Sequence, residues 1–160
     1  MGFPDRTTTI GRMINDFLNN QEEVCNEAIH LLFSANRYEN LKKIRDTLQA
    51  GKNIVCDRYW YSGVAYSAAK GMDFEWCRTA DQHLLQPDLI IYLDCDPEVL
   101  SKRANYGQER FEKLEFQKKV AASFATLLEG EKKVRKVSVE AKSLDEVKEE
   151  VRELIEKELQ

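Results

Sequence analysis

The chain has 160 residues, of which 42% are hydrophobic and 32% charged, with 7 Gly and 3 Pro. This length predicts one domain, and the composition excludes the disordered, collagen-like and low-complexity classes of protein. The formal net charge is −4, and the acidic excess lies in residues 140–160 without a basic stripe elsewhere. Nucleic acid is therefore not expected as a partner.

The longest apolar run, residues 89–93, is far shorter than the ~20 residues that cross a bilayer, so no membrane partner is expected. The N-terminus has no apolar signal core, which predicts a cytoplasmic protein, with the nucleus as the other compartment. The four cysteines are widely spaced and have no histidine pair nearby to complete a zinc site. They are predicted to be free thiols in the core of a reduced protein.

Hydrophobic spacing predicts the elements of the N-terminal half. Thr8 or Thr9 is expected to cap a helix whose apolar stripe includes Ile14. A longer helical stretch is predicted over residues 22–50, with a polar middle at 34–40 that bends or breaks it. Residues 53–57 are short, β-branched and apolar, a pattern typical of a strand buried on both faces.

The alternation of helices and strands continues to the C-terminus. The remaining predicted elements are helices at 62–70 and 74–85, a strand at 89–93, a helix from Pro97 capped by Asp96, a helix at 116–128, a strand at 134–139 and a helix at 144–159 whose inward face includes Leu144. Strands separated by helices predict an α/β fold with a parallel sheet covered on both faces. Ligands in such folds bind beyond the carboxyl ends of the strands.

Two charged residues directly follow the strand at 53–57. Asp57 and Arg58 would place an acid and a guanidinium at the ligand-binding edge of the sheet, and the planar fork of arginine bonds two phosphate oxygens at once. The alternative interpretation is an ion pair that ties the end of the strand to its neighbour. The residues alone favour neither interpretation.

A second pair of residues lies on the helical stretch. Phe33 precedes Arg37 by four residues, so the two share one helix face, where a ring stacks on a base and a guanidinium reads its edge. A core phenylalanine beside a surface arginine is the alternative, and the residues alone favour it. His30 is predicted to pack or to hydrogen-bond rather than to act as a base, and Asp96 to cap a helix rather than to bind metal.

Several linked motifs occur in a characteristic order, at residues 3–8, 30–39, 57–66, 87–98 and 102–112. In order and spacing they resemble the thymidylate kinase family over most of the chain, and the short loop in the last segment is similar to the eukaryotic and poxvirus branch. The resemblance implies a three-layer parallel sheet of the nucleoside monophosphate kinase type. It also implies transfer of a phosphoryl group from ATP to dTMP, giving dTDP, with Mg²⁺.

The resemblance further implies roles for individual residues in binding dTMP. Phe33 would stack on thymine, and Arg37 would bond the edge of the base. Arg6 and Arg58 would hold the monophosphate, with Arg58 also catalytic. Tyr66 would lie against the sugar and select deoxyribose.

The other implied roles concern polar contacts, metal and donor. Ser62 and Gln117 would make polar contacts to dTMP. Asp57, the second implied catalytic residue, would place Mg²⁺ through water. Arg103 and Arg110 would belong to a lid, at about 104–112, that closes over ATP.

One family feature is missing from residues 1–160. No G-x-x-x-x-G-K-[ST] segment occurs, so we expect the family's first strand, P-loop and first helix to be absent. That strand would lie between the strands at 53–57 and 89–93, and its loss would leave buried backbone groups unpaired, at ~1–3 kcal/mol each. The chain would then be an incomplete version of a longer protein, or its sheet would be repaired by repacking or by another chain.

Three functions follow as alternatives. The first is a thymidylate kinase that lacks its N-terminal segment and would transfer the phosphoryl group from ATP only when that segment is restored. A homodimer through the helical stretch at 22–50 is possible. The second is a non-catalytic protein that binds dTMP or another partner and has lost the ATP site. The third is a kinase of another nucleotide or deoxynucleoside, which keeps the fold and changes the base.

Overall fold

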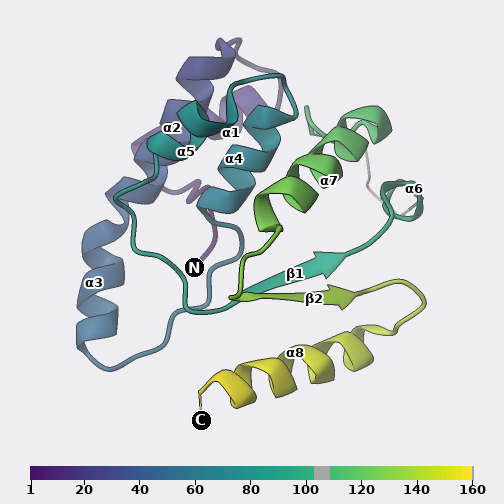
Figure 1. The fold of residues 1–160 in the computed structure, drawn as a ribbon. Coiled ribbons are helices and arrows are strands. Elements are labelled where there is room, and N and C mark those ends of the chain that lie inside the picture. Colours follow the sequence, from purple (N-terminus) through teal and green to yellow (C-terminus); the bar gives the residue numbers. More distant parts are fainter. Residues whose placement is uncertain (103–108, 160) are drawn as a thin grey trace. The chain divides into compact units, whose positions relative to one another are not determined.

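The computed structural model describes residues 1–102 and 109–159 (Figure 1). The elements are α1 (Thr9–Leu18), α2 (Asn26–Glu39), α3 (Leu41–Gln49), α4 (Trp60–Ala68), α5 (Phe74–Thr79), β1 (Ile90–Asp94), α6 (Pro97–Leu100), α7 (Leu114–Leu128), β2 (Val134–Ser138) and α8 (Leu144–Glu158). The chain divides into two compact units, Met1–Leu84 with Gly107–Leu127, and Leu85–Tyr106 with Leu128–Gln160. Each unit is described by itself.

The turn that precedes α1 is fixed on α2. Thr8 caps α1 as predicted, because its hydroxyl accepts the backbone N–H of Gly11 at 2.9 Å. Gly11 has no room for a side chain, since a Cβ there would lie 1.8 Å from the carbonyl oxygen of Asp5. The buried Asn36 of α2 accepts the backbone N–H of Asp5 at 2.7 Å. These contacts hold the segment that carries Arg6.

The predicted helical stretch at 22–50 breaks inside its polar middle, as expected, but it begins later than predicted. Asn40 separates α2 from α3, and its side chain donates to the carbonyl of Asn36 at 3.2 Å. Asparagine favours such local bonds over a continuous helix. Helix α2 starts only at Asn26, after the N-cap Cys25. Cys25 is exposed, so the prediction that all four cysteines lie in the core is wrong, and Cys77 is the one classed as buried.

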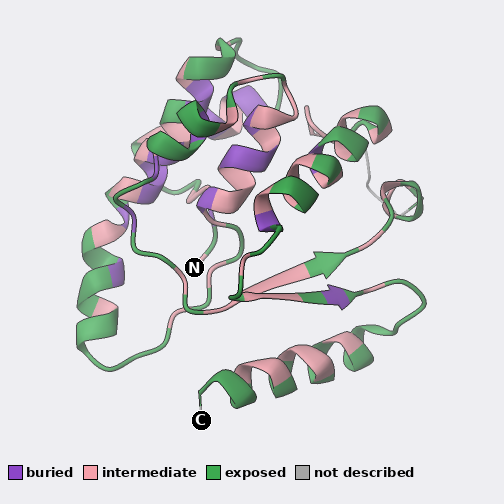
Figure 2. Ribbon diagram, viewed as in Figure 1, coloured by how far each residue is buried: buried purple, intermediate pink, exposed green. Residues whose placement is uncertain are grey.

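Two apolar clusters form the core of the first unit, and the buried residues in Figure 2 gather on its helices. One cluster joins α1 to α2 and contains Ile14, Phe17, Leu18 and Ile29. The other joins α4 to the region of α5 and contains Trp60, Val64, Cys77 and Leu84. Helix α2 packs on both α1 and α4, so it borders both clusters.

The strand predicted at 53–57 is not formed in the described structure, which has one parallel bridge there, between Gly2 and Asp57. Asp57 donates its N–H to Met1 O at 2.8 Å and accepts from Phe3 N at 2.9 Å. Val55 is 74% exposed, so the expectation of burial on both faces is also wrong. The apolar pattern identified an extended segment, but burial depends on neighbours that the pattern does not contain.

The second unit contains the parallel pair of strands that the sequence predicts. β1 and β2 pair in parallel, from Ile90 opposite Val134 to Asp94 opposite Ser138, and α8 packs on β2 (Figure 1). The predicted cap of α6 is confirmed, because Asp96 accepts the N–H of Glu98 at 2.7 Å.

Helix α8 begins with a capping box in which Ser143 and Glu146 each accept the other's backbone N–H. Val151 and Ile155 are half-buried on its inward face, as predicted. Leu144 is 69% exposed and is an exception. Helical side chains tilt toward the N-terminus, so the side chain of the first residue extends past the end of the helix.

Within residues 1–102 and 109–159, no helix combines the length and apolar character that a bilayer crossing needs. In the same residues, no group of three or more His, Cys, Asp or Glu side chains is arranged to hold a metal ion.

Candidate functional site

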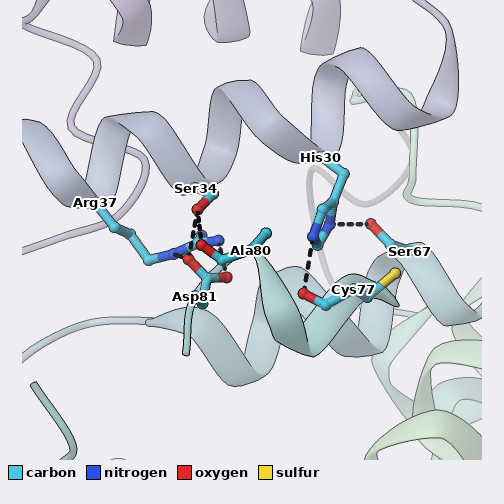
Figure 3. Close-up of polar contacts among 7 residues, drawn as sticks. All are labelled: His30, Ser34, Arg37, Ser67, Cys77, Ala80 and Asp81. Atoms are coloured by element: carbon cyan, nitrogen blue, oxygen red, sulfur yellow. Dashed lines mark hydrogen bonds and ion pairs between the residues drawn. The ribbon is translucent and has the colours of Figure 1, made fainter. Parts of the chain in front are cut away.

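Arg37 of α2 is buried in an ion pair with Asp81 (Figure 3). Its Nε donates to Oδ1 of Asp81 at 3.0 Å and its Nη2 to Oδ2 at 2.5 Å. The two side chains are only 3% and 1% exposed. The alternative of a surface arginine is therefore wrong, because a buried partner 44 residues away neutralises the guanidinium.

Asp81 also explains why the helix predicted at 74–85 ends at Thr79. Ser34 of α2 donates to Oδ1 of Asp81 at 2.8 Å and to the carbonyl of Ala80 at 3.0 Å. These contacts hold residues 80 and 81 against α2, where the chain continues in turns.

Helix α4 lies close to the Arg37 guanidinium, at Gly63. A Cβ at Gly63 would lie 2.9 Å from Nη2 and 3.2 Å from Nη1 of Arg37, so only glycine allows this approach. Nη1 makes no hydrogen bond to any described residue. Ser62, the predicted polar contact, is half-buried next to Gly63 in the first turn of α4.

His30 lies one turn before Ser34 on α2 and is 1% exposed. Its Nε2 lies 3.1 Å from the carbonyl oxygen of Cys77, and its Nδ1 lies 2.8 Å from Oγ of Ser67 (Figure 3). A carbonyl only accepts, so Nε2 carries the proton and Nδ1 accepts from Ser67. Burial lowers the pKa of His30 below its ordinary value. The prediction of a hydrogen-bonding residue is confirmed.

The lowered pKa of His30 predicts a pH-dependent stability. As the pH falls below about 6.5, the unfolded chain binds a proton before the folded chain does, so the unfolded state gains stability. We expect the free energy of unfolding in urea to fall between pH 7 and pH 5. His30→Gln should be less stable at pH 7 and less sensitive to pH.

The matched control for this experiment is His83→Gln, because His83 is exposed and is the other of the chain's two histidines. It should keep the pH dependence of the unchanged protein. An equal pH dependence in His30→Gln and in the unchanged protein would contradict the assignment.

Arg58 has a left-handed backbone, with φ of 62°, directly after the bridge at Asp57. This conformation costs a residue other than glycine about 1–3 kcal/mol, and residues strained in this way cluster at functional sites. The guanidinium carbon lies 5.3 Å from the centre of the Tyr66 ring. Arg58 and Tyr66, predicted for phosphate and sugar, are therefore neighbours.

Gln117 of α7 meets the same tyrosine. Its Nε2 donates to the Tyr66 hydroxyl at 3.4 Å and to the carbonyl of Phe111 at 2.8 Å. Tyr66 faces Phe111 edge-on, with the ring centres 6.0 Å apart. Phe111 also packs, like Phe33, against the cluster between α1 and α2. No role was predicted for Phe111, although it lies in the motif segment at 102–112 and directly follows a polar, glycine-containing stretch.

Arg6 is exposed and already holds two partners. Its Nη1 donates to Asn15 at 2.9 Å, and its Nη2 donates to Glu109 at 2.8 Å. Burial lowers the pKa of the Arg58 guanidinium, but Tyr66 and nearby carboxylates, among them Glu109, outweigh it and raise the pKa. Of the two arginines predicted to bind phosphate, Arg6 is the one that is bonded to Glu109. Nothing in the sequence pattern singled out this carboxylate.

Arg110 binds to the end of α1 and to the residues that follow it. Its Nε donates to the carbonyl of Phe17 at 3.0 Å, and its two Nη atoms donate to Glu23 at 3.0 and 2.7 Å. Its guanidinium also stacks on the Phe17 ring at 4.2 Å. The role of Arg110 at ATP stays a prediction. Arg103 and most of the predicted lid lie outside the described residues.

The structure thus joins Arg58, Tyr66 and Gln117 directly, and it pairs Arg6 with Glu109. Phe33 is half-buried in the cluster that Phe111 also contacts. Asp57 is exposed beside Arg58.

The sequence and the fold are similar to those of known proteins. The family model described as thymidylate kinase matches residues 1–151. A thymidylate kinase from Dictyostelium discoideum is 47% identical over 98% of this chain and 69% of its own length. One from Schizosaccharomyces pombe is 46% identical over 89% of this chain and 67% of its own length. One from Arabidopsis thaliana is 43% identical over 96% of this chain, which spans 57% of that protein.

A solved thymidylate kinase from Candida albicans has a TM-score of 0.91 to this chain at 38% identity, covering 98% of this chain and 78% of that one. This similarity confirms the predicted α/β fold with a parallel sheet. Because the family match and the similarity to these relatives extend over nearly the whole sequence, the chain belongs to the thymidylate kinase family.

Proposed function

We propose that this chain binds dTMP as the phosphoryl acceptor of a thymidylate kinase, which transfers a phosphoryl group from ATP and releases dTDP. The observation that carries the proposal is that Arg58 lies 5.3 Å from the centre of the Tyr66 ring, while Arg6 pairs with the carboxylate of Glu109. The arrangement supplies two guanidinium groups and an aromatic surface, which suit a small anionic nucleoside.

The phosphate is the strongest part of this argument. Guanidinium groups form charge-assisted bonds with phosphate oxygens, which are stronger than bonds between neutral groups. In the free protein the Glu109 carboxylate binds Arg6 at 2.8 Å. The monophosphate of dTMP would replace Glu109 as the partner of Arg6, and it would also contact Arg58.

The base and sugar are assigned to residues near the first unit's aromatic side chains. Phe33 would stack on the pyrimidine, and the Nη1 edge of Arg37 would donate to its carbonyl oxygen. Tyr66 would lie against the deoxyribose, while Gln117 and Ser62 would complete the polar contacts.

Phosphoryl transfer needs charge stabilisation more than covalent chemistry, because its transition state spreads negative charge over the phosphoryl oxygens. Arg58 is the proposed catalytic group for that charge. Mg²⁺ in such sites binds one or two carboxylates, waters and substrate phosphates, and when bound it neutralises phosphate charge. The exposed carboxylate of Asp57 fits this use through water. Residues 1–160 contain no G-x-x-x-x-G-K-[ST] segment, and Arg103 and Arg110 are proposed for ATP.

The proposal includes a cytoplasmic protein that forms a homodimer through α2 and α3, where Leu31 and Leu48 are 49% and 45% exposed. A monomer in sedimentation experiments at micromolar concentration would contradict the dimer. Fluorescent fusion protein found outside the cytoplasm would contradict the location.

The central experiment is calorimetric titration of the purified chain with dTMP and with thymidine. We expect dTMP to bind more tightly, because only dTMP offers a phosphate to Arg6 and Arg58. Equal affinities would contradict the phosphate site.

Transfer is tested separately by incubating the chain with dTMP, ATP and Mg²⁺ and measuring dTDP by chromatography. Because residues 1–160 contain no P-loop sequence, we expect dTDP to form when a P-loop segment is joined to the chain, and to form more slowly there with Arg58→Ala. Binding of dTMP by the joined protein without any dTDP would contradict the kinase assignment and leave the acceptor site standing.

A further inference from the structure

The plane of the Arg37 guanidinium is fixed by its ion pair with Asp81. Asp81 accepts from Nε at 3.0 Å and from Nη2 at 2.5 Å, so the guanidinium and the carboxylate lie fork to fork. Ser34, three residues before Arg37 on α2, holds Oδ1 of the same carboxylate at 2.8 Å. The partner of Arg37 is therefore itself oriented by α2, and the guanidinium cannot rotate without breaking two bonds in a buried site.

Gly63 leaves the Arg37 guanidinium just enough room to keep its position beside α4. A Cβ at Gly63 would lie 2.9 Å from Nη2 and 3.2 Å from Nη1. An arginine tip on the surface would simply move aside, but this one is held by Asp81. A larger residue at position 63 would therefore displace the guanidinium against its ion pair.

Nη1 is the edge of Arg37 left for a ligand, since it has no hydrogen bond to a described residue and the side chain keeps 3% exposure. Its N–H groups only donate. Thymine offers a carbonyl acceptor at position 4 of the ring, where cytosine offers an amino donor. A fixed donor at this position would accept thymine and reject cytosine.

We propose that Asp81 and Gly63 are positioning residues that hold the Nη1 edge of Arg37 for the carbonyl oxygen of the pyrimidine, and that they thereby determine the preference for thymine over cytosine. This inference rests on the proposed function, in which Arg37 reads the base. Asp81 and Gly63 act through Arg37 and need not touch the nucleotide.

The test measures the affinities of dTMP and dCMP by calorimetry and compares their ratio between variants. The unchanged chain should prefer dTMP. Asp81→Asn keeps the shape of the side chain but turns one acceptor into a donor facing Nη2, and it should reduce the preference about tenfold. Gly63→Ala should reduce the preference by a similar factor.

Two controls separate positioning from general damage. Asp46→Asn removes an exposed carboxylate that pairs with Lys42, and Gly2→Ala adds a methyl group where nothing lies within 4 Å. Both should leave the ratio unchanged. Gly63→Ala retains both charged residues of the ion pair, so it tests the proposal even if Asp81→Asn fails to fold in circular dichroism.

The outcomes distinguish this inference from the proposed function. Arg37→Lys keeps the buried charge and loses the fork, so it should also lower the preference for dTMP. An unchanged ratio in Arg37→Lys would overturn the base-reading role of Arg37 itself. A lowered ratio in Arg37→Lys with unchanged ratios in Asp81→Asn and Gly63→Ala would overturn the positioning role alone. Equal losses for dTMP and dCMP in those two variants would also overturn it.

Discussion

Arg58→Ala is expected to weaken dTMP binding about 100-fold and to change thymidine binding less than about threefold. Truncating one partner of a close charged pair costs about 2–5 kcal/mol, and every 1.4 kcal/mol is tenfold in affinity. The phosphate of dTMP loses that partner, whereas thymidine has no phosphate to lose. Calorimetric titration of both ligands measures the two changes.

Arg45→Ala is the matched control, because Arg45 is an exposed arginine on α3. It removes the same charge and should leave both affinities unchanged. Phe33→Ala should weaken both ligands about equally, because both carry the base. The phosphate assignment fails if Arg58→Ala weakens thymidine as much as dTMP.

The second large effect concerns stability. Arg37→Met should lower the free energy of unfolding by about 3–5 kcal/mol, because it leaves the carboxylate of Asp81 buried without its partner. That loss is a large part of the ~5–15 kcal/mol by which a typical domain is stable. Urea unfolding followed by circular dichroism measures it.

Two further variants test the cause. Lys42→Met breaks an ion pair whose side chains are 87% and 57% exposed, and it should cost less than ~1 kcal/mol. The double variant Arg37→Met with Asp81→Leu removes both buried charges and should recover much of the lost stability. Similar losses for Arg37→Met and Lys42→Met would show that the buried pair contributes little.

The sequence predicted best what nearby residues determine. The cap at Thr8, the break near Asn40 and the cap at Asp96 depend on bonds that span two to four residues. The strand at 53–57 was predicted wrongly, because its pairing and burial depend on distant segments.

The residues of the candidate site likewise include some that the sequence predicts and some that only the structure shows. Arg58 and Tyr66 could be chosen from their position after an apolar run and from the family resemblance. Asp81 and Glu109 could not, since they meet Arg37 and Arg6 across 44 and 103 residues. Burial of Arg37 was missed because helical periodicity marks apolar residues and carries no sign of a distant carboxylate that neutralises an arginine.

In the proposed phosphate site, the bond between Arg6 and Glu109 would make anion binding an exchange reaction. A tethered carboxylate competes at an effective concentration on the order of millimolar or higher, whatever the salt in solution. Chloride or sulfate must outcompete it with a single contact, whereas a nucleotide brings a ring and a sugar as well. We therefore expect Glu109 to reduce the binding of inorganic ions at this site, and Glu109→Gln should make dTMP titrations more sensitive to added sulfate.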